Sequence, residues 1–258
     1  MDLVGDDMDS YEFSPEEVAA VKSRFPKLEY ISTGVWKGIL EFDHIYRDYR
    51  IIDSYEIGIA VPAIYPTRLP FVFDLKGRAM AAAKKHGKKS VLDSHWSPGH
   101  GVCLCVRQEE KIKFPPGSDM IFFIENLVIP YFYGLSYFEE YGQWPWREYG
   151  HGGLGVLERH AEETEEQTRE DLGAILPVFR DDLKNWRKYR AQFVRPSGNK
   201  NCFCESGKQF FECHPLAWKG MVRLYEDLKR LRLNPYKFFS KPVRANVTRR
   251  NHEKVSHL

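Results

Sequence analysis

Hydrophobic and polar residues follow different periods in different parts of this chain, and each period predicts one kind of element. Near the N-terminus, Val18, Val21 and Phe25 recur every three to four residues, as in an amphipathic helix. Ser14 and Glu17 stand in front of this stripe at the spacing of a capping box. These residues predict a short helix that begins directly after Ser14 and ends at Phe25.

From Tyr30 to about Leu75 apolar residues alternate with polar ones, as in strands with one buried face. The alternation runs through "GVWKGILEF", "YRIIDSYEIGIAVP" and "PFVFDL". We predict three or four antiparallel strands here and, with the helices on either side, an α+β fold. The next segment, Gly77 to Asp93, is rich in basic and small residues and fits a loop or a short helix equally well.

Helical spacing returns after "FPPG". A helix capped by Ser118 is predicted, with Ile121, Ile124 and Leu127 on one face and with its end at Pro130. The aromatic stretch that follows, "YFYGLSYFEEYGQWPW", is expected to pack back on the sheet.

The C-terminal half alternates between polar and apolar segments. The stretch from Glu158, "ERHAEETEEQTRED", predicts a polar connector. Two apolar stripes typical of amphipathic helices follow: Phe179, Leu183, Trp186 and Phe193, and then Met221, Leu224, Leu228 and Leu231. Between them "VRPSGNK" is short, polar and rich in turn residues, which indicates a boundary.

Composition narrows the class of protein. Of the 258 residues, 43% are hydrophobic and 29% charged, as in folded globular proteins. The net charge is only +2, from 38 basic and 36 acidic residues, so a nucleic-acid partner is not expected. The N-terminus lacks the apolar core of a signal peptide, and no run approaches the roughly 18 apolar residues of a membrane span. A cytoplasmic protein is therefore expected.

The five cysteines fall into two groups, unlike the disulfide framework of a secreted protein. The second group, "CFCESGKQFFECH", offers three thiols and one imidazole, from Cys202, Cys204, Cys213 and His214. Three thiolates and one imidazole match the ligand set of a closed, tetrahedral structural zinc site. Four protein ligands leave no open position for catalysis, so this zinc is expected to stabilise the fold.

The spacing C-x-C-x8-C-H resembles the SEC-C motif, a small zinc-binding module at the ends of varied bacterial proteins. The match includes the paired cysteines, the Ser-Gly-Lys turn, the aromatic pair Phe210 and Phe211, and the terminal Cys-His. This resemblance implies that residues 196–258 contain a zinc module followed by a helix and a basic tail.

The first cysteine group lies in "HWSPGHGVCLCVRQ", where Cys103 and Cys105 follow two histidines, two glycines and a proline. The residues alone leave four interpretations open. The pair can bind a metal together with His95 or His100, act as a redox dithiol, contain one nucleophile, or be ordinary buried cysteines. Cys105 is most simply a core residue.

Motifs before and after this stretch favour the nucleophile. "WKGILEF", "YEIGIAVPAIYPTRLPFVFDL", His95 and "GVCL" follow one another, and "GQWPWREYGHGGLG" comes later. In this order they resemble the ubiquitin-conjugating enzymes, including bacterial members. That family has an N-terminal helix, a four-stranded antiparallel meander, a proline-rich crossover and one nucleophilic cysteine. The matching positions are Pro62, Tyr65, Pro66, Leu69, Pro70, His95 and Cys103.

This resemblance implies a transferase that holds a protein's C-terminal carboxyl group as a thioester on Cys103 and passes it to an amine. The thiolate is the attacking species, and nearby histidines can lower its pKa. The expected partners are an activating enzyme and either a ubiquitin-like protein or a nucleotidyltransferase with a reactive C-terminus. By analogy with bacterial members, an anti-phage defence system is the expected setting.

One position departs from the family. Its asparagine, which donates to the oxyanion of the intermediate, belongs two residues after the histidine, where this chain has Ser97. Loss of an oxyanion donor typically costs about a hundredfold or more in rate. The candidate replacements are the Ser97 hydroxyl, His100, His151 and a backbone N–H near Cys103. His95 is expected to fix a turn rather than to carry a proton.

The two resemblances together divide the chain into three parts. Residues 1–160 form the conjugating domain, 161–195 a helical connector, and 196–258 the zinc module with its helix and tail. The missing asparagine also supports an alternative: a catalytically inactive interaction module of the same fold, whose zinc-stabilised appendage recruits partners.

Overall fold

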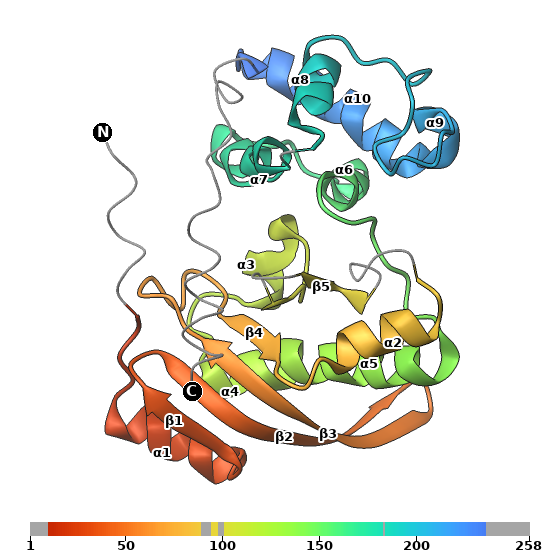
Figure 1. Ribbon diagram of the computed structural model, residues 1–258. Coiled ribbons are helices and arrows are strands. Elements are labelled where there is room, and N and C mark those ends of the chain that lie inside the picture. The colour runs from red at the N-terminus through yellow and green to blue at the C-terminus, as the bar shows by residue number, and fades with distance from the viewer. Residues whose placement is uncertain (1–9, 89–93, 98–100, 183, 236–258) are drawn as a thin grey trace. The chain divides into compact units, whose positions relative to one another are not determined.

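The structure is a computed structural model that describes residues 10–88, 94–97, 101–182 and 184–235 (Figure 1). These residues form two compact units, each with its own hydrophobic core. Unit 1 comprises residues 10–105 and 110–147, and unit 2 comprises residues 106–109 and 148–235. The fold is α+β with one four-stranded antiparallel sheet, which confirms the predicted class.

Unit 1 begins with helix α1 (Pro15–Arg24), at the predicted position. The Ser14 hydroxyl accepts a hydrogen bond from the Glu17 N–H at 3.2 Å, and the Glu17 carboxylate accepts one from the Ser14 N–H at 2.8 Å. The capping box is therefore confirmed. It fixes the first turn, and the apolar stripe buries Val21 and Phe25.

Four strands follow in sequence order and pair with their neighbours: β1 (Leu28–Ser32), β2 (Val35–Tyr46), β3 (Tyr49–Ala60) and β4 (Phe71–Asp74). The predicted antiparallel strands are confirmed. Between β2 and β3, Trp36 lies opposite Ile59 and Leu40 opposite Tyr55. All four side chains are buried, so this face of the sheet is the core face.

The segment that fitted a loop or a helix contains helix α2 (Arg78–Lys85), while its residues 89–93 lie outside the described part of the chain. The Asp74 carboxylate, at the end of β4, accepts hydrogen bonds from the backbone N–H groups of Lys76, Gly77 and Ala79. These donors have no acceptor within the helix, so Asp74 stabilises its N-terminus.

One continuous helical stretch crosses the core face of the sheet (Figure 1). It consists of α4 (Met120–Phe123), a π-helical segment η3 (Ile124–Val128) and α5 (Ile129–Tyr141). Two predictions about it were wrong. The N-cap is Asp119 rather than Ser118, and its carboxylate accepts from the Phe122 N–H at 2.7 Å. The helix also continues past Pro130.

The π-helical segment explains how the helix contains a proline. In a regular α-helix the Pro130 ring would crowd the carbonyl of Asn126, and its nitrogen would donate no hydrogen bond. The wider π turn directly before Pro130 removes the need for that bond. The apolar pattern therefore extends through the proline instead of ending there.

The aromatic residues of α5 pack against the sheet, as predicted. The Phe132 ring lies 4.4 Å from the Tyr55 ring on β3, and the Tyr133 hydroxyl donates to the Tyr49 carbonyl at 2.9 Å. Trp144, beyond the helix, stacks on Phe138. These contacts join the two longest strands and the long helix into one core.

The stretch Met120–Tyr141 is long and apolar enough to cross a membrane by length and composition, contrary to the expectation from the sequence. In this structure, however, 56% of its most apolar window is buried inside the protein. Packing on both the sheet and α2 explains why so many of its residues are apolar.

Unit 2 is helical, with α6 (Gly153–Glu162), α7 (Arg169–Asp181), α8 (Trp186–Val194), α9 (Phe210–Cys213) and α10 (Pro215–Arg230). The amphipathic helix with Met221, Leu224 and Leu228 is confirmed as α10. The predicted polar connector is helical up to Glu162, because one side of α6 is buried. The stripe from Phe179 to Phe193 spans two helices, and Leu183 between them lies outside the described residues.

The boundaries between the two units differ from the boundaries of the three predicted parts. The boundary follows residue 147, and the helical connector shares one core with the C-terminal module. Residues 106–109, including the short helix η2 (Arg107–Glu109), also belong to unit 2. The Gln108 side-chain amide donates to the Val156 carbonyl at 2.8 Å, and Glu109 pairs with Arg159. A short helix buries its apolar face only when it packs against other helices, so these segments share one core.

Helices α6 and α10 approach closely at a glycine. A Cβ on Gly220 would lie 1.8 Å from the Leu157 carbonyl oxygen, so only glycine fits there. Nearby, the buried His160 ring bonds the Asp227 carboxylate at 3.0 Å, and burial lowers the pKa of His160. The neutral ring joins the same two helices.

We expect Gly220→Ala to lower the free energy of unfolding by about 1–3 kcal/mol, because α6 and α10 must move apart. Gly173→Ala in α7 is the matched control, since its Cβ would meet nothing within 4 Å. That variant should be as stable as the wild type or gain up to about 1 kcal/mol from helix propensity. Urea unfolding measures both, and an undiminished stability of Gly220→Ala would contradict the close packing.

Candidate functional site

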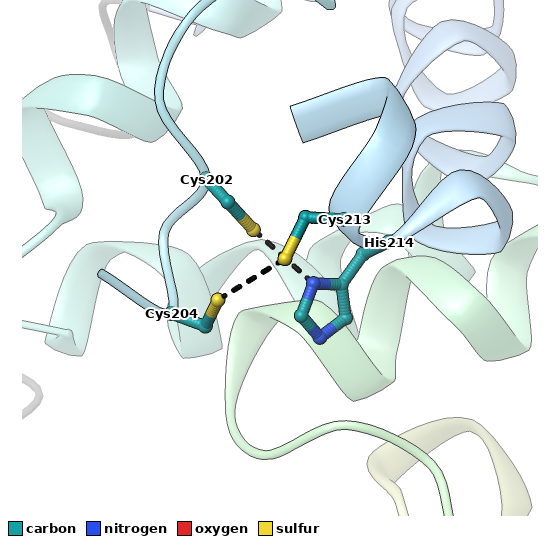
Figure 2. Close-up of side chains that lie close together, drawn as sticks. All are labelled: Cys202, Cys204, Cys213 and His214. Carbon is teal, nitrogen blue, oxygen red and sulfur yellow. Dashed lines mark hydrogen bonds between the residues drawn. The ribbon is translucent and has the colours of Figure 1, made fainter. Parts of the chain in front are cut away.

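The second cysteine group lies where a loop of unit 2 meets two helices (Figure 2). Cys202 and Cys204 lie on the loop before α9, Cys213 is the last residue of α9, and His214 directly precedes α10. The Cys202 N–H donates to the Lys208 carbonyl at 2.9 Å, which closes the loop into a tight turn. All four predicted ligands come together.

The geometry of this group suits a metal ion. The four ligand atoms all lie within 4.8 Å of one another. Cys202 Sγ is 3.2 Å from His214 Nδ1, and Cys204 Sγ is 3.5 Å from Cys213 Sγ (Figure 2). A tetrahedral ion with bonds of roughly 2.3 Å to sulfur would place the sulfurs just under ~4 Å apart. The cluster can therefore hold a metal ion.

The thiols of this cluster ionise to different extents. Burial raises the pKa of Cys202 to about 12. Burial also opposes ionisation of Cys204, but hydrogen bonds from the side chain and backbone of Ser206 outweigh it and lower the Cys204 pKa. A bound cation favours the thiolate of each cysteine, so metal binding releases protons and weakens as the pH falls.

Two features around the cluster were not predicted from the sequence. The Ser206 hydroxyl lies 3.1 Å from Cys213 Sγ, so the turn residue also contacts a ligand. The side chains of Phe203 and Phe210, between the ligands, are buried, and Phe203 stacks on Tyr189 of α8 at 4.2 Å. The position of Phe203 between Cys202 and Cys204 was the available signal, because an apolar residue between two predicted ligands favours burial.

The first cysteine group lies in unit 1, beside a short hairpin of β5 (Trp96–Ser97) and β6 (Gly101–Val102). A Cβ on Gly101 would lie 2.1 Å from the Val72 carbonyl oxygen, so a glycine lets the hairpin approach β4 closely. Cys103 follows β6 directly and is exposed. Its Sγ lies 3.8 Å from the Cys105 carbonyl oxygen. Cys105 itself packs against the core, so the two thiols differ in exposure.

The backbone before Cys103 is anchored to the core of unit 1. The Tyr131 hydroxyl of α5 donates to the buried Ser94 carbonyl at 3.0 Å. Burial raises the Tyr131 pKa well above its ordinary value, so this group stays a neutral donor. The His95 ring lies edge-on to Trp144 at 4.8 Å, and the Cys103 N–H donates to the His95 carbonyl at 2.7 Å. His95 thus connects Cys103 to the aromatic core.

The structure shows less of the remaining predicted site residues, which are Ser97, His100 and His151. Ser97 lies on β5, opposite Gly101, and only its backbone is described. His100 lies outside the described residues. His151 belongs to unit 2, whereas His95, Ser97 and Cys103 belong to unit 1.

The proline-rich segment connects β3 to β4 in unit 1, where the resemblance expects a crossover. Its Tyr65–Pro66 peptide bond is cis. The Tyr65 ring is buried and contacts Tyr11 at 4.9 Å and Phe114 at 6.0 Å. This segment packs as scaffold.

Comparisons with protein-family models, with curated proteins and with solved structures find no match for this chain. Two features of the chain itself carry its functional interpretation. One is the Cys/His cluster of unit 2 that could hold a metal ion, and the other is the exposed Cys103 of unit 1.

We expect Cys213→Ser to lower the metal content of the purified protein severalfold or more, because one thiolate ligand is lost. Its thermal unfolding should resemble that of the wild type treated with a chelator, and acidification should release the ion from the wild type. Elemental analysis by mass spectrometry and melting curves measure these effects. Cys105→Ser, in the core of unit 1, is the control with unchanged metal content. Equal metal in both variants would refute the site.

Proposed function

We propose that this protein is a transferase of the ubiquitin-conjugating type. It carries the C-terminal carboxyl group of a donor protein as a thioester on Cys103 and delivers it to an amine. Its partners are an activating enzyme that supplies the thioester and a donor that is a ubiquitin-like protein or a nucleotidyltransferase with a reactive C-terminus. A cytoplasmic protein of a bacterial anti-phage system is the setting that fits this chemistry.

The proposed reaction has two acyl transfers. First, the Cys103 thiolate attacks the carbonyl of the donor's thioester on the activating enzyme, and the activating enzyme's thiolate leaves. Then an amine attacks the new thioester, an amide bond forms, and the Cys103 thiolate leaves, while the amine loses its proton to water or a nearby base. Neither step needs an oxidant or a metal.

The exposure of Cys103 is the observation that carries this proposal. A thiol that receives a protein from another protein must be accessible, and Cys103 is exposed while its neighbour Cys105 packs against the core. Its position also supports the proposal, since it follows a helix and a four-stranded meander whose β3–β4 connection is the proline-rich segment. The backbone anchor at His95 holds the exposed thiol in place.

The hydrogen bonds narrow the choice of oxyanion donor. The Cys103 N–H is already bonded to the His95 carbonyl, so it is a poor candidate for the family's missing asparagine. The Ser97 hydroxyl remains the nearest replacement in sequence, with His100 as a further candidate, whereas His151 belongs to the other unit. One of them must donate to the negatively charged oxygen for the transfer to be fast.

For the cluster of unit 2 we propose a structural zinc ion in a module of the SEC-C type. Three thiolates and an imidazole favour zinc, and four protein ligands leave no open position for a substrate. Elemental analysis should then find one zinc ion per chain. In this proposal residues 196–258 form the zinc module behind a conjugating domain in residues 1–160 and a connector in 161–195.

A second candidate function is a catalytically inactive interaction module of the same fold. Ser97 favours it, because the family's asparagine is absent. In that case the zinc module recruits partners, and Cys103 is an unreactive surface thiol.

We expect tagged wild-type protein, expressed in cells with its natural partners, to form a covalent adduct that reducing agents cleave. Cys103→Ser should form an oxyester that resists reducing agents and yields to hydroxide, and Cys103→Ala should form no adduct. Non-reducing electrophoresis and mass spectrometry detect these species. Cys105→Ala is the matched control and should behave as the wild type. An adduct that persists in Cys103→Ala would exclude Cys103 as the carrier.

The rate of alkylation separates the two candidate functions. An activated Cys103 should react with iodoacetamide at neutral pH several times faster than a cysteine in an unstructured peptide, because the thiolate is the species that is alkylated. Mass spectrometry of the modified peptide follows this rate at single residues. A rate no higher than that of the peptide would favour the inactive module.

A further inference from the structure

Helix α8 of unit 2 belongs to a strongly basic segment that the metal cluster and Cys103 do not explain. Residues 184–200 contain six lysines and arginines and no aspartate or glutamate, in a chain with a net charge of only +2. The basic residues are Lys184, Arg187, Lys188, Arg190, Arg195 and Lys200. The segment is therefore strongly positive, and acidic residues elsewhere in the chain offset most of its charge.

The packing of α8 decides where these charges lie. One side of the helix buries Asn185, Tyr189, Gln192 and Phe193 in the core of unit 2. The opposite side must carry the remaining positions, and Arg187, Lys188 and Arg195 are exposed. At 1.5 Å of rise per residue, α8 extends over about 10 Å from Arg187 to its end at Val194, and Arg195 follows directly. These charges form one cationic surface rather than a scattered set.

An aromatic residue organises two of the guanidinium groups. Trp186 is half-buried against the core, and the guanidinium carbons of Arg187 and Arg190 lie 5.3 and 5.4 Å from its ring. Such cation–π contacts restrict the arginine side chains without neutralising their charge. A restricted, planar guanidinium pairs well with the oxygens of a phosphate.

Two carboxylates act at the N-terminal end of this segment. Glu205 pairs with Lys184 at 2.6 Å, and its charge also acts on Lys188. Asp182 accepts hydrogen bonds from the backbone and side chain of Asn185. The cationic surface around Arg187 and Arg195 lies further along the helix.

We propose that this surface, formed by the exposed Arg187, Lys188 and Arg195, binds the phosphate backbone of single-stranded nucleic acid. A phosphate backbone needs only a row of cations, and it is bound without a pocket or sequence preference. An acidic peptide on a helix surface would also need apolar anchors. Between the cations this face offers only Ala191 and Val194, so nucleic acid fits it better. The low net charge of the whole chain does not exclude this local surface.

The test measures binding of the full chain to a fluorescein-labelled 15-nucleotide uridine RNA by fluorescence anisotropy at two or more salt concentrations. The variant Arg187→Gln, Lys188→Gln, Arg195→Gln removes two exposed cations from α8 and a third that directly follows it. We expect it to bind at least about tenfold more weakly at low salt and to lose roughly 2 from the salt slope, because each phosphate contact contributes about 0.7.

The matched control removes three exposed cations from other parts of unit 2: Lys208→Gln, Lys219→Gln and Arg232→Gln. It has the same net charge as the α8 variant and should bind nearly as the wild type does. The substituted side chains are exposed, so melting curves should be unchanged. If the triple variant unfolds, the single variants Arg187→Gln and Arg195→Gln should each weaken binding severalfold.

Three results would overturn the proposal. The first is wild-type protein that does not bind the RNA at low salt. The second is equal weakening in the α8 variant and the control, which would assign binding to overall charge. The third is displacement of the RNA by polyglutamate at the same charge concentration as by unlabelled RNA, which would favour an acidic protein partner.

Discussion

The packing of the Met120–Tyr141 helix against the core face of the sheet is the interaction on which unit 1 depends. Its aromatic side chains meet the long strands β2 and β3, and the π turn keeps it continuous through Pro130. The same helix also controls the candidate loop. Tyr131 bonds the Ser94 carbonyl, Trp144 beyond the helix contacts the His95 ring, and His95 holds the backbone of Cys103. The backbone position of Cys103 thus depends on contacts with this buried helix and with Trp144.

Unit 2 depends on a different constraint. Its helices are short, and each buries its apolar residues only by packing against the other helices and the loop. The loop between α8 and α9 places both Cys202 and Phe203 in this core, and folding brings Cys202, Cys204, Cys213 and His214 together in a cluster that could hold a metal ion. The core also orients α8, whose buried face leaves its arginines and lysine outside. A bound ion that ties this loop to α10 would therefore stabilise the core and the cationic surface at once.

Local signals in the sequence were sufficient for several parts of the structure. The capping box of α1 depends on residues three apart, and the antiparallel strands depend on alternation with period two, so both were predictable. The metal cluster was predictable for the same reason, because thirteen consecutive residues contain all four ligands. The N-cap at Asp119, the passage through Pro130 and the helical start of the polar connector were not, because each depends on packing partners distant in sequence.

The sequence by itself determined the α+β class, the strands, the amphipathic helix α10 and a Cys/His set that could hold a metal ion, because these follow from short-range spacing and the chemistry of side chains. Only the tertiary structure decided which cysteine of the first group is exposed, since Cys103 and Cys105 stand in nearly identical local sequence and differ through the core beneath them. The tertiary structure also decided that residues 106–109 and the connector share the core of unit 2, and that the charges of α8 lie on one face. Burial depends on which surfaces meet, and spacing along a chain does not contain that information.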